Sequence, residues 1–173
     1  GRLMDHRRHA LDPAELPDFE ELRNQANLIK RHTIENLDYY LERFEAQVQA
    51  RGGHLLWART GSDVADFVLE VARRHQARLI VKSKSMTTEE IDLRERLAPH
   101  GLETVETDLG EYILQLAGER PYHIVAPALH KTREDVGEIF SRRLGVPFEQ
   151  EPEKQTKIAR RVLREKFLAA HIG

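Results

Sequence analysis

The sequence predicts an α/β fold built on a parallel sheet. Four short apolar runs begin 24, 24 and 20 residues apart, and amphipathic helical patterns lie between them. The runs are His54–Ala58, Arg78–Lys82, Leu102–Thr107 and Tyr122–Ala126. Strands that alternate with helices at this spacing are typical of a parallel sheet with right-handed crossovers. We therefore expect four parallel strands with helices on both faces of the sheet.

A long helical arm is expected before this sheet. Apolar residues recur at spacings of three and four between Leu22 and Val48, and Gly52-Gly53 ends the pattern. The resulting helix would have about thirty residues, with Asn24 and Asn27 as the candidate positions of a break. A helix of this length is expected to lie across another surface, its own or a partner's. The segment Gly1–Leu16 shows no periodicity and is expected to be an extended arm.

The chain is expected to divide into three regions. Residues 1–53 form the helical arm, residues 54–145 the α/β core, and residues 146–173 a linker with a C-terminal helix. In the last part of the core, a helix is expected from Thr132 to Arg143, ending at Gly145. Pro147 and Pro152 mark the linker, and the final helix should end near Ala170.

Composition excludes several classes of function. The chain has 173 residues with 27 basic and 29 acidic side chains, a formal net charge of −2. A general binder of nucleic acid or anionic membranes would need a basic excess, and no apolar run approaches the ~18 residues of a membrane span. The chain has no cysteine, which excludes thiolate zinc sites and iron–sulfur clusters within it. We expect a soluble cytoplasmic domain without nucleic-acid partners.

The ends of the predicted strands carry cations beside hydroxyl groups. In an open parallel sheet, ligands bind outside the carboxyl ends of the strands, where helix N-termini also point. Two loops at this edge therefore predict an anion site. The candidate residues are Lys82, Ser83, Lys84, Ser85 and Thr87 in one loop and His130 and Lys131 in the other.

Ordinary helix capping is the competing interpretation of these loops. Thr87 with Glu90 has the spacing of a capping box, and Asp108 with Glu111 and Thr132 with Asp135 are similar. Glu111 is the candidate acid/base group because it follows a strand end closely, although a capping role would also explain it. No other catalytic residue is predicted.

The histidines do not predict a metal site. His6 and His9 offer at most two ligands in the N-terminal arm, which is too few for a zinc site. His123 is expected to be a packed or edge residue at the start of a strand. The chain also has no dinucleotide fingerprint and no Walker A motif.

Several segments in order resemble the LUD domain at the N-terminus of the lactate-utilization iron–sulfur proteins. The most specific are VKSKSM at Val81–Met86 and ETDLGEY at Glu106–Tyr112, supported by Ala50–His54 and His123–Ala128. The resemblance implies a cytoplasmic subunit of a complex that oxidises L-lactate to pyruvate. It also implies a Rossmann-like sheet similar to the sugar-phosphate isomerases and coenzyme A transferases.

The chain departs from the family pattern after residue 173. The resemblance implies that a glycine-rich second half of the domain follows, and then a cysteine-rich region with 4Fe–4S clusters. We therefore expect an incomplete domain, a piece of a longer protein, that does not oxidise lactate by itself. A missing half would leave a sheet edge or core face exposed, or covered by the terminal helices or a second copy, so self-association or domain swapping is expected.

Three functions remain open at this point. The first is a part of a lactate-oxidising, electron-transferring complex that binds a small anion or contacts other subunits. The second is an enzyme-like domain that binds a phosphosugar or coenzyme A, which rests on fold analogy. The third is a non-catalytic assembly module that docks a partner through its long N-terminal helix.

Overall fold

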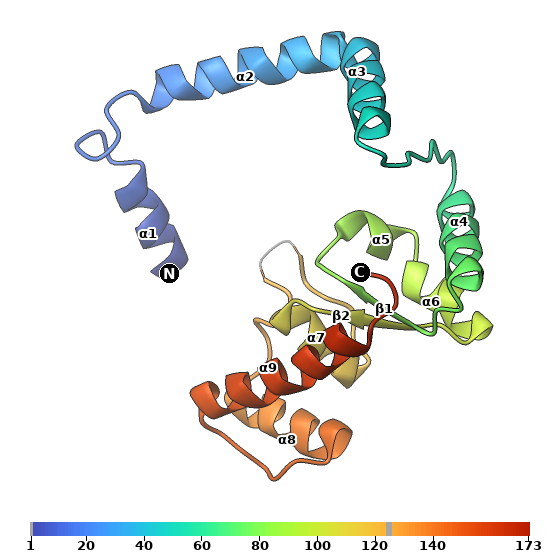
Figure 1. Ribbon diagram of the computed structural model, residues 1–173. Coiled ribbons are helices and arrows are strands. Elements are labelled where there is room, and N and C mark those ends of the chain that lie inside the picture. Colours follow the sequence, from blue (N-terminus) through green and yellow to red (C-terminus); the bar gives the residue numbers. More distant parts are fainter. Residues whose placement is uncertain (1, 124–125) are drawn as a thin grey trace. The chain divides into compact units, whose positions relative to one another are not determined.

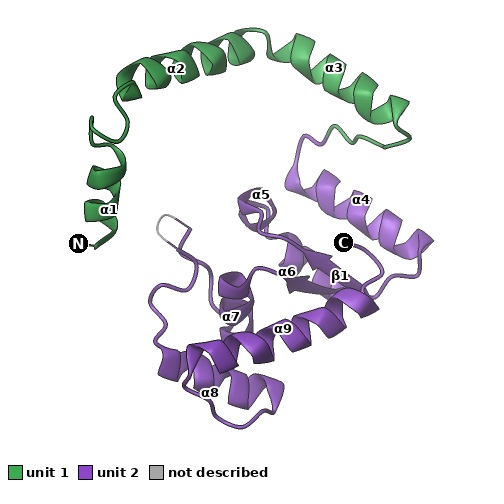
Figure 2. Ribbon diagram, turned by 60° about the vertical axis from the view of Figure 1, so that its left-hand side comes forward, with its two compact units in different colours: residues 1–57 green, residues 58–173 purple. Residues whose placement is uncertain are grey.

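The computed structural model describes residues 2–123 and 126–173 of the chain. The chain divides into two compact units, Gly1–Trp57 and Ala58–Gly173 (Figure 2). Each unit is described by itself below.

The first unit consists of three helices, α1 (Arg2–Ala10), α2 (Phe19–Glu35) and α3 (Leu37–Ala50) (Figure 1). None of its described residues is buried. The expectation of an extended arm over Gly1–Leu16 is wrong, because α1 occupies most of it. The break in the long helix lies at Asn36 and not at Asn24 or Asn27. The Asn36 side chain donates to the carbonyl of His32 at 2.8 Å, and such local bonds compete with regular helix.

The apolar stripe of this unit faces outward. Leu22 and Ile29 of α2 are 48% and 67% exposed, and Phe44 of α3 is 56% exposed. The periodicity therefore predicts helix correctly, but no apolar surface covers it within the described residues.

The predicted strand His54–Ala58 is not a strand. No paired strand includes these residues, and Trp57 is 54% exposed. A short apolar run favours extended backbone, but a strand also needs a neighbour to accept and donate its hydrogen bonds. This segment has no such neighbour among the described residues.

The sheet of the second unit contains β1 (Leu79–Lys82) and β2 (Glu103–Glu106). The two strands are parallel, with Leu79 opposite Glu103 and Lys82 opposite Glu106. This confirms the prediction of a parallel α/β fold, although the described residues form two strands and not four. The predicted strand Tyr122–Ala126 includes residues 124–125, which lie outside the described residues.

Both edges of the sheet have further partners. Beside β1, the amide of Val81 donates to the carbonyl of Ile172 at 2.9 Å, and the amide of His171 donates to the carbonyl of Leu79 at 3.0 Å. Beside β2, the side-chain amide of Gln115 accepts from the amide of Glu106 at 2.9 Å and donates to the carbonyl of Thr104 at 2.6 Å. The Gln115 side chain thus takes the place of a neighbouring strand.

Helices cover both faces of this sheet, as the sequence predicts. On one face, Ile80 packs with α4 (Gly61–Arg74) and α6 (Leu93–Leu97). On the other face, Leu79 and Val81 pack with α7 (Leu109–Ala117) and α9 (Pro152–Ala169). This alternation follows from the two-residue period of strand side chains.

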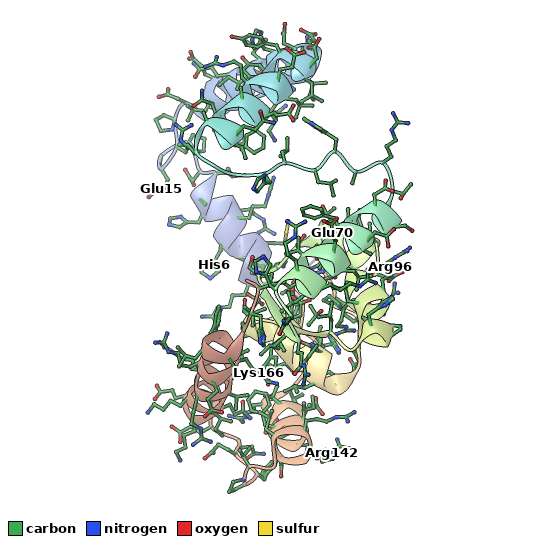
Figure 3. The ribbon with its side chains drawn as sticks, turned by 45° about the vertical axis from the view of Figure 1, so that its right-hand side comes forward. His6, Glu15, Glu70, Arg96, Arg142 and Lys166 are labelled. Atoms are coloured by element: carbon green, nitrogen blue, oxygen red, sulfur yellow. The ribbon has the colours of Figure 1, made fainter. Side chains whose placement is uncertain are left out.

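Two short elements lie next to the strands in the sequence. The short helix α5 (Met86–Glu90) follows β1, and a single 3₁₀ turn, η1 (Ala98–His100), precedes β2. Arg96 of α6, which is labelled in Figure 3, donates to the hydroxyl of Ser62 at the start of α4 at 3.1 Å.

A third packing cluster joins α7, α8 (Arg133–Leu144) and α9 around Phe140, which is 2% exposed. The capping box predicted at Thr132 and Asp135 is present at the start of α8. The final helix ends where the sequence predicts, but it begins at Pro152, a residue favoured in the first helical turn. None of the helices in the described part of the chain has the length and apolar character that crossing a membrane requires.

Candidate functional site

A cleft of about 300 Å³ lies at the carboxyl ends of β1 and β2. Its walls come from the strand ends, α5, the start of α6, α7 and the segment of residues 119–123. Seven carboxylate side chains line it, against three lysine or arginine side chains and His123. A cleft with this balance of charge attracts cations more readily than anions.

Lys82 of the predicted anion site forms an ion pair inside this cleft. Its ammonium lies 2.7 and 2.8 Å from the two carboxylate oxygens of Glu106, the residue opposite it in the sheet. The two side chains are 14% and 8% exposed. The positive charge of Lys82 is therefore already balanced by a buried carboxylate.

His130 and Lys131 do not line the Lys82 cleft, but both contact Glu119, which does. The Nε2 atom of His130 lies 2.8 Å from one Glu119 oxygen, and the Lys131 ammonium donates to the other. The hydrogen bonds from Lys131 and then His130 hold the pKa of Glu119 below its usual value. The structure therefore divides the predicted anion surface into two separate ion-pair groups.

Among the hydroxyl residues predicted in the first loop, Ser85 serves as a helix cap. Ser85 accepts from the amide of Thr88 at 3.3 Å and begins α5, so the predicted cap at Thr87 is wrong by two residues. Thr87 lies within α5, and Ser83 and Lys84 are exposed. The Lys84 ammonium lies 3.9 Å from Oε1 of Glu111, and 41% of its side chain is exposed.

Glu111 is a buried carboxyl in the first turn of α7. Asp108 caps this helix by accepting from the amides of Gly110 and Glu111 at 3.1 and 3.4 Å, so the predicted cap at Asp108 is confirmed. The capping role considered for Glu111 is wrong, because its side chain does not accept from the Asp108 amide to complete a capping box. Glu111 is only 2% exposed, and within the described part of the chain neither of its oxygens has a hydrogen-bond partner. Burial, and then the charges of Glu89 and Glu106, raise the pKa of Glu111.

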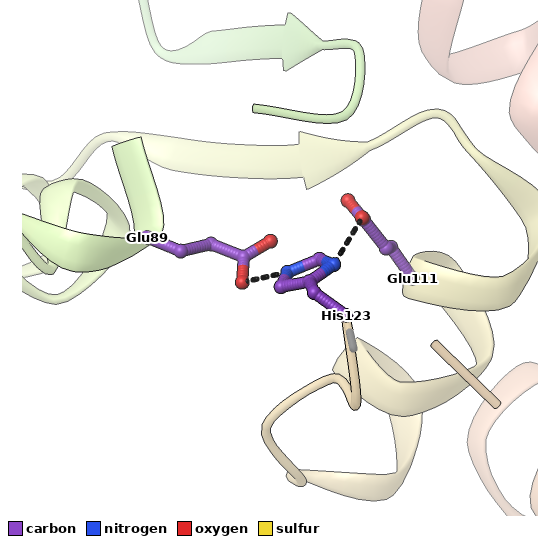
Figure 4. A group of neighbouring side chains, drawn as sticks. All are labelled: Glu89, Glu111 and His123. Carbon is purple, nitrogen blue, oxygen red and sulfur yellow. Dashed lines mark hydrogen bonds and ion pairs between the residues drawn. The ribbon is translucent and has the colours of Figure 1, made fainter. Parts of the chain in front are cut away.

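His123 lies between Glu111 and Glu89 (Figure 4). Its Nε2 atom is hydrogen-bonded to a Glu89 oxygen, and its Nδ1 atom lies 3.7 Å from Oε1 of Glu111. The His123 side chain is 12% exposed. Sequence reasoning placed His123 at a strand start and did not predict its contact with two carboxylates.

The arrangement can bind a proton or a cation at its centre. If Nε2 carries the proton that Glu89 accepts, Nδ1 of a neutral ring is an acceptor that faces a second acceptor, Glu111. Two acceptors at this distance are stable only if one is protonated or if a cation balances them. Glu89, Glu111 and His123 each offer a ligand atom, and these atoms lie within 4.8 Å of one another.

Comparison with known proteins assigns the family. A family model described as LUD domain matches residues 41–173. The chain belongs to the LUD domain family. This confirms the resemblance found in the VKSKSM and ETDLGEY segments of the sequence.

Relatives of this LUD domain carry names from lactate utilization. Lactate utilization protein B 2 of Bacillus mycoides (strain KBAB4) is 46% identical over 172 residues, which are 99% of this chain and 36% of that protein. Lactate utilization protein B from Bacillus cereus (strain B4264) and from Bacillus thuringiensis (strain Al Hakam) match with the same identity and coverage. The chain therefore spans about a third of the length of these relatives. No solved structure gives a significant match.

Proposed function

We propose that this LUD domain is part of a cytoplasmic iron–sulfur protein that oxidises L-lactate to pyruvate together with other subunits. The observation that carries the proposal is the 46% identity to lactate utilization protein B over 99% of the chain. The oxidation removes an electron pair from the α-hydroxy carbon, and the electrons need an acceptor. Because this chain has no cysteine, clusters held by cysteine thiolates must be bound outside it.

Within this function, we propose that Lys84 binds a small anion beside the cleft, next to Glu111. Lys82 and Lys131 are each paired with a glutamate and are 14% and 15% exposed, whereas Lys84 has its closest carboxylate oxygen at 3.9 Å and is 41% exposed. The carboxylate of lactate or pyruvate is the anion that fits the proposed reaction. The acid/base role of Glu111, beside this anion, stays a prediction.

The proposal is tested at two levels. In the full-length protein with its partner subunits, we expect bound iron and reduction of a dye that depends on lactate. Absence of lactate-dependent reduction in an iron-loaded preparation would refute the lactate role.

The anion site is tested by titrating the chain with lactate, pyruvate, phosphate and coenzyme A. Lys84→Ala should weaken lactate binding roughly ten- to a hundred-fold, since a charge-assisted contact contributes ~1.5–3 kcal/mol. Lys157→Ala is the matched control, because Lys157 is an exposed lysine on α9, whereas Lys84 lies 3.9 Å from Glu111. Equal affinities in both variants would exclude Lys84, and preferential binding of coenzyme A or phosphate would favour the phosphosugar or coenzyme A alternative.

A second function, assembly with a partner, is favoured by the first unit. Its helices expose apolar side chains such as Leu28, Ile29 and Phe44, and large apolar patches on a protein surface mark interaction sites. Sedimentation of the chain alone and with the other subunits distinguishes self-association from docking of another protein. A monomer that binds none of the subunits would exclude the assembly function.

A further inference from the structure

We propose that Glu89, Glu111 and His123 bind a divalent transition-metal ion, with Zn²⁺ and Mn²⁺ as the ions to test. The inference is independent of the lactate role, since metal binding can be measured without turnover. It adds a metal site at a place where the sequence predicts none.

The three side chains converge from separate elements. Glu89 comes from α5, Glu111 from the first turn of α7, and His123 from the turn that follows residue 120. Their ligand atoms lie within 4.8 Å of one another, and all three side chains point toward a common centre (Figure 4). Bonds of about 2.0–2.2 Å from carboxylate oxygen and imidazole nitrogen to a central ion require only small side-chain adjustments from such an arrangement.

The buried carboxylate of Glu111 is the independent sign of a ligand. Both of its oxygens and the Nδ1 atom of His123 are buried without a hydrogen-bond partner among the described residues. Polar atoms in protein interiors are nearly always satisfied, so each exception requires an explanation such as an ion. An ion between Glu111 and Nδ1 of His123 would satisfy the Nδ1 lone pair and the facing Glu111 oxygen.

The hydrogen bond between Glu89 and His123 supports the same centre. When Nε2 of a histidine donates to a carboxylate, the ring is oriented and its other nitrogen is left as a ligand. In the proposed site Glu89 both orients the ring and supplies a carboxylate oxygen as the third ligand.

The surroundings of the cluster favour a doubly charged cation. Seven carboxylates line the cleft against three lysine or arginine side chains. Lys131 and Lys84, which do not line the cleft, approach Glu119 and Glu111, but an excess of negative charge remains for a divalent ion to reduce. One imidazole and two carboxylates suit Zn²⁺, Fe²⁺ or Mn²⁺ better than Mg²⁺ or Ca²⁺, which prefer ligand sets made only of oxygen. Three protein ligands leave at least one coordination position for water or a small anion.

The experiment is calorimetric titration of the chelator-treated chain of 173 residues with ZnCl₂ and MnCl₂. We expect one ion per chain for at least one of the two metals, with an affinity that falls as the pH is lowered because protons compete for the ligands. His123→Gln and Glu111→Gln should each weaken binding about ten- to a hundred-fold or more. Circular dichroism of the metal-free variants shows whether they are folded. If His123→Gln does not fold, the near-isosteric Glu111→Gln still tests the site.

Two matched controls locate the ion. Glu95→Gln removes a carboxylate that lines the same cleft but lies outside the cluster, and it should leave the affinity nearly unchanged. A variant with His6→Gln and His9→Gln tests the N-terminal histidines as competing ligands and should also bind normally. The proposal is wrong if neither ion binds saturably, if the folded cluster variants bind as well as the original chain, or if a control variant loses binding equally.

Discussion

Replacing Gln115 by leucine tests how the outer edge of β2 is stabilised. Thr104 and Glu106 are 4% and 6% exposed, and their backbone groups on the side away from β1 bond to the Gln115 amide at 2.6 and 2.9 Å. Leucine has a similar size but offers neither donor nor acceptor. A buried backbone group that loses its partner costs about 1–3 kcal/mol, so two such groups should lower the free energy of unfolding by about 2–6 kcal/mol. That is a large part of the ~5–15 kcal/mol typical of a whole protein.

Urea denaturation followed by circular dichroism measures this change. Gln115→Glu is the informative second variant, because a carboxylate can accept from Glu106 but cannot donate to Thr104, and it should also be destabilised. Gln150→Leu is the control, since Gln150 is exposed and bonds only to side chains, and a surface change of this kind stays within about 0.5 kcal/mol. A loss below about 0.5 kcal/mol in Gln115→Leu would show that water replaces the amide, and the reasoning would fail.

Three further outcomes are expected. Because burial raises the pKa of Glu111, its contribution to stability is present below the unfolded pKa of ~4.3 and is lost as the pH rises through the folded pKa. In metal-free urea titrations Glu111→Gln should therefore gain stability relative to the original chain as the pH rises, and parallel pH profiles would contradict this. Phe140→Ala should lower the free energy of unfolding by about 3–5 kcal/mol, measured in the same way, because Phe140 is 2% exposed between α8 and its neighbours. Gly137→Ala should cost about 1–3 kcal/mol, because its Cβ would collide with the carbonyl oxygen of Glu149; unchanged melting would show that the Glu149 loop can move.

Local patterns in the sequence predict much of the second unit. The apolar runs at residues 78–82 and 102–107 contain β1 and β2, and their separation by a helical segment predicts parallel pairing. Asp108 and Thr132 cap helices as their spacing predicts. These features depend on neighbours within a few residues, which is why the sequence alone reveals them.

The long-range features could not be predicted in the same way. Thr87 and Ser85 are both residue types that cap helices, and the structure shows that α5 begins directly after Ser85. Where the helix begins depends on the path of the chain after β1, which the sequence does not reveal. Lys82 has the sequence context of a ligand-binding cation, but the sheet register places Glu106 directly opposite it. Glu89 and His123 are 34 residues apart in the sequence, and no spacing rule connects them, so the Glu89–Glu111–His123 cluster has no signal in the sequence.

The pairing of Ile172 beside β1 limits how two copies of this chain could join. Exposed strand edges are the usual templates for adding a strand from another molecule. Here residues 171–172 take the hydrogen bonds on one side of β1, and β2 takes those on the other. An incoming strand would have to displace these residues first, so an association between copies is expected to use side-chain surfaces and not a continuous intermolecular sheet along β1.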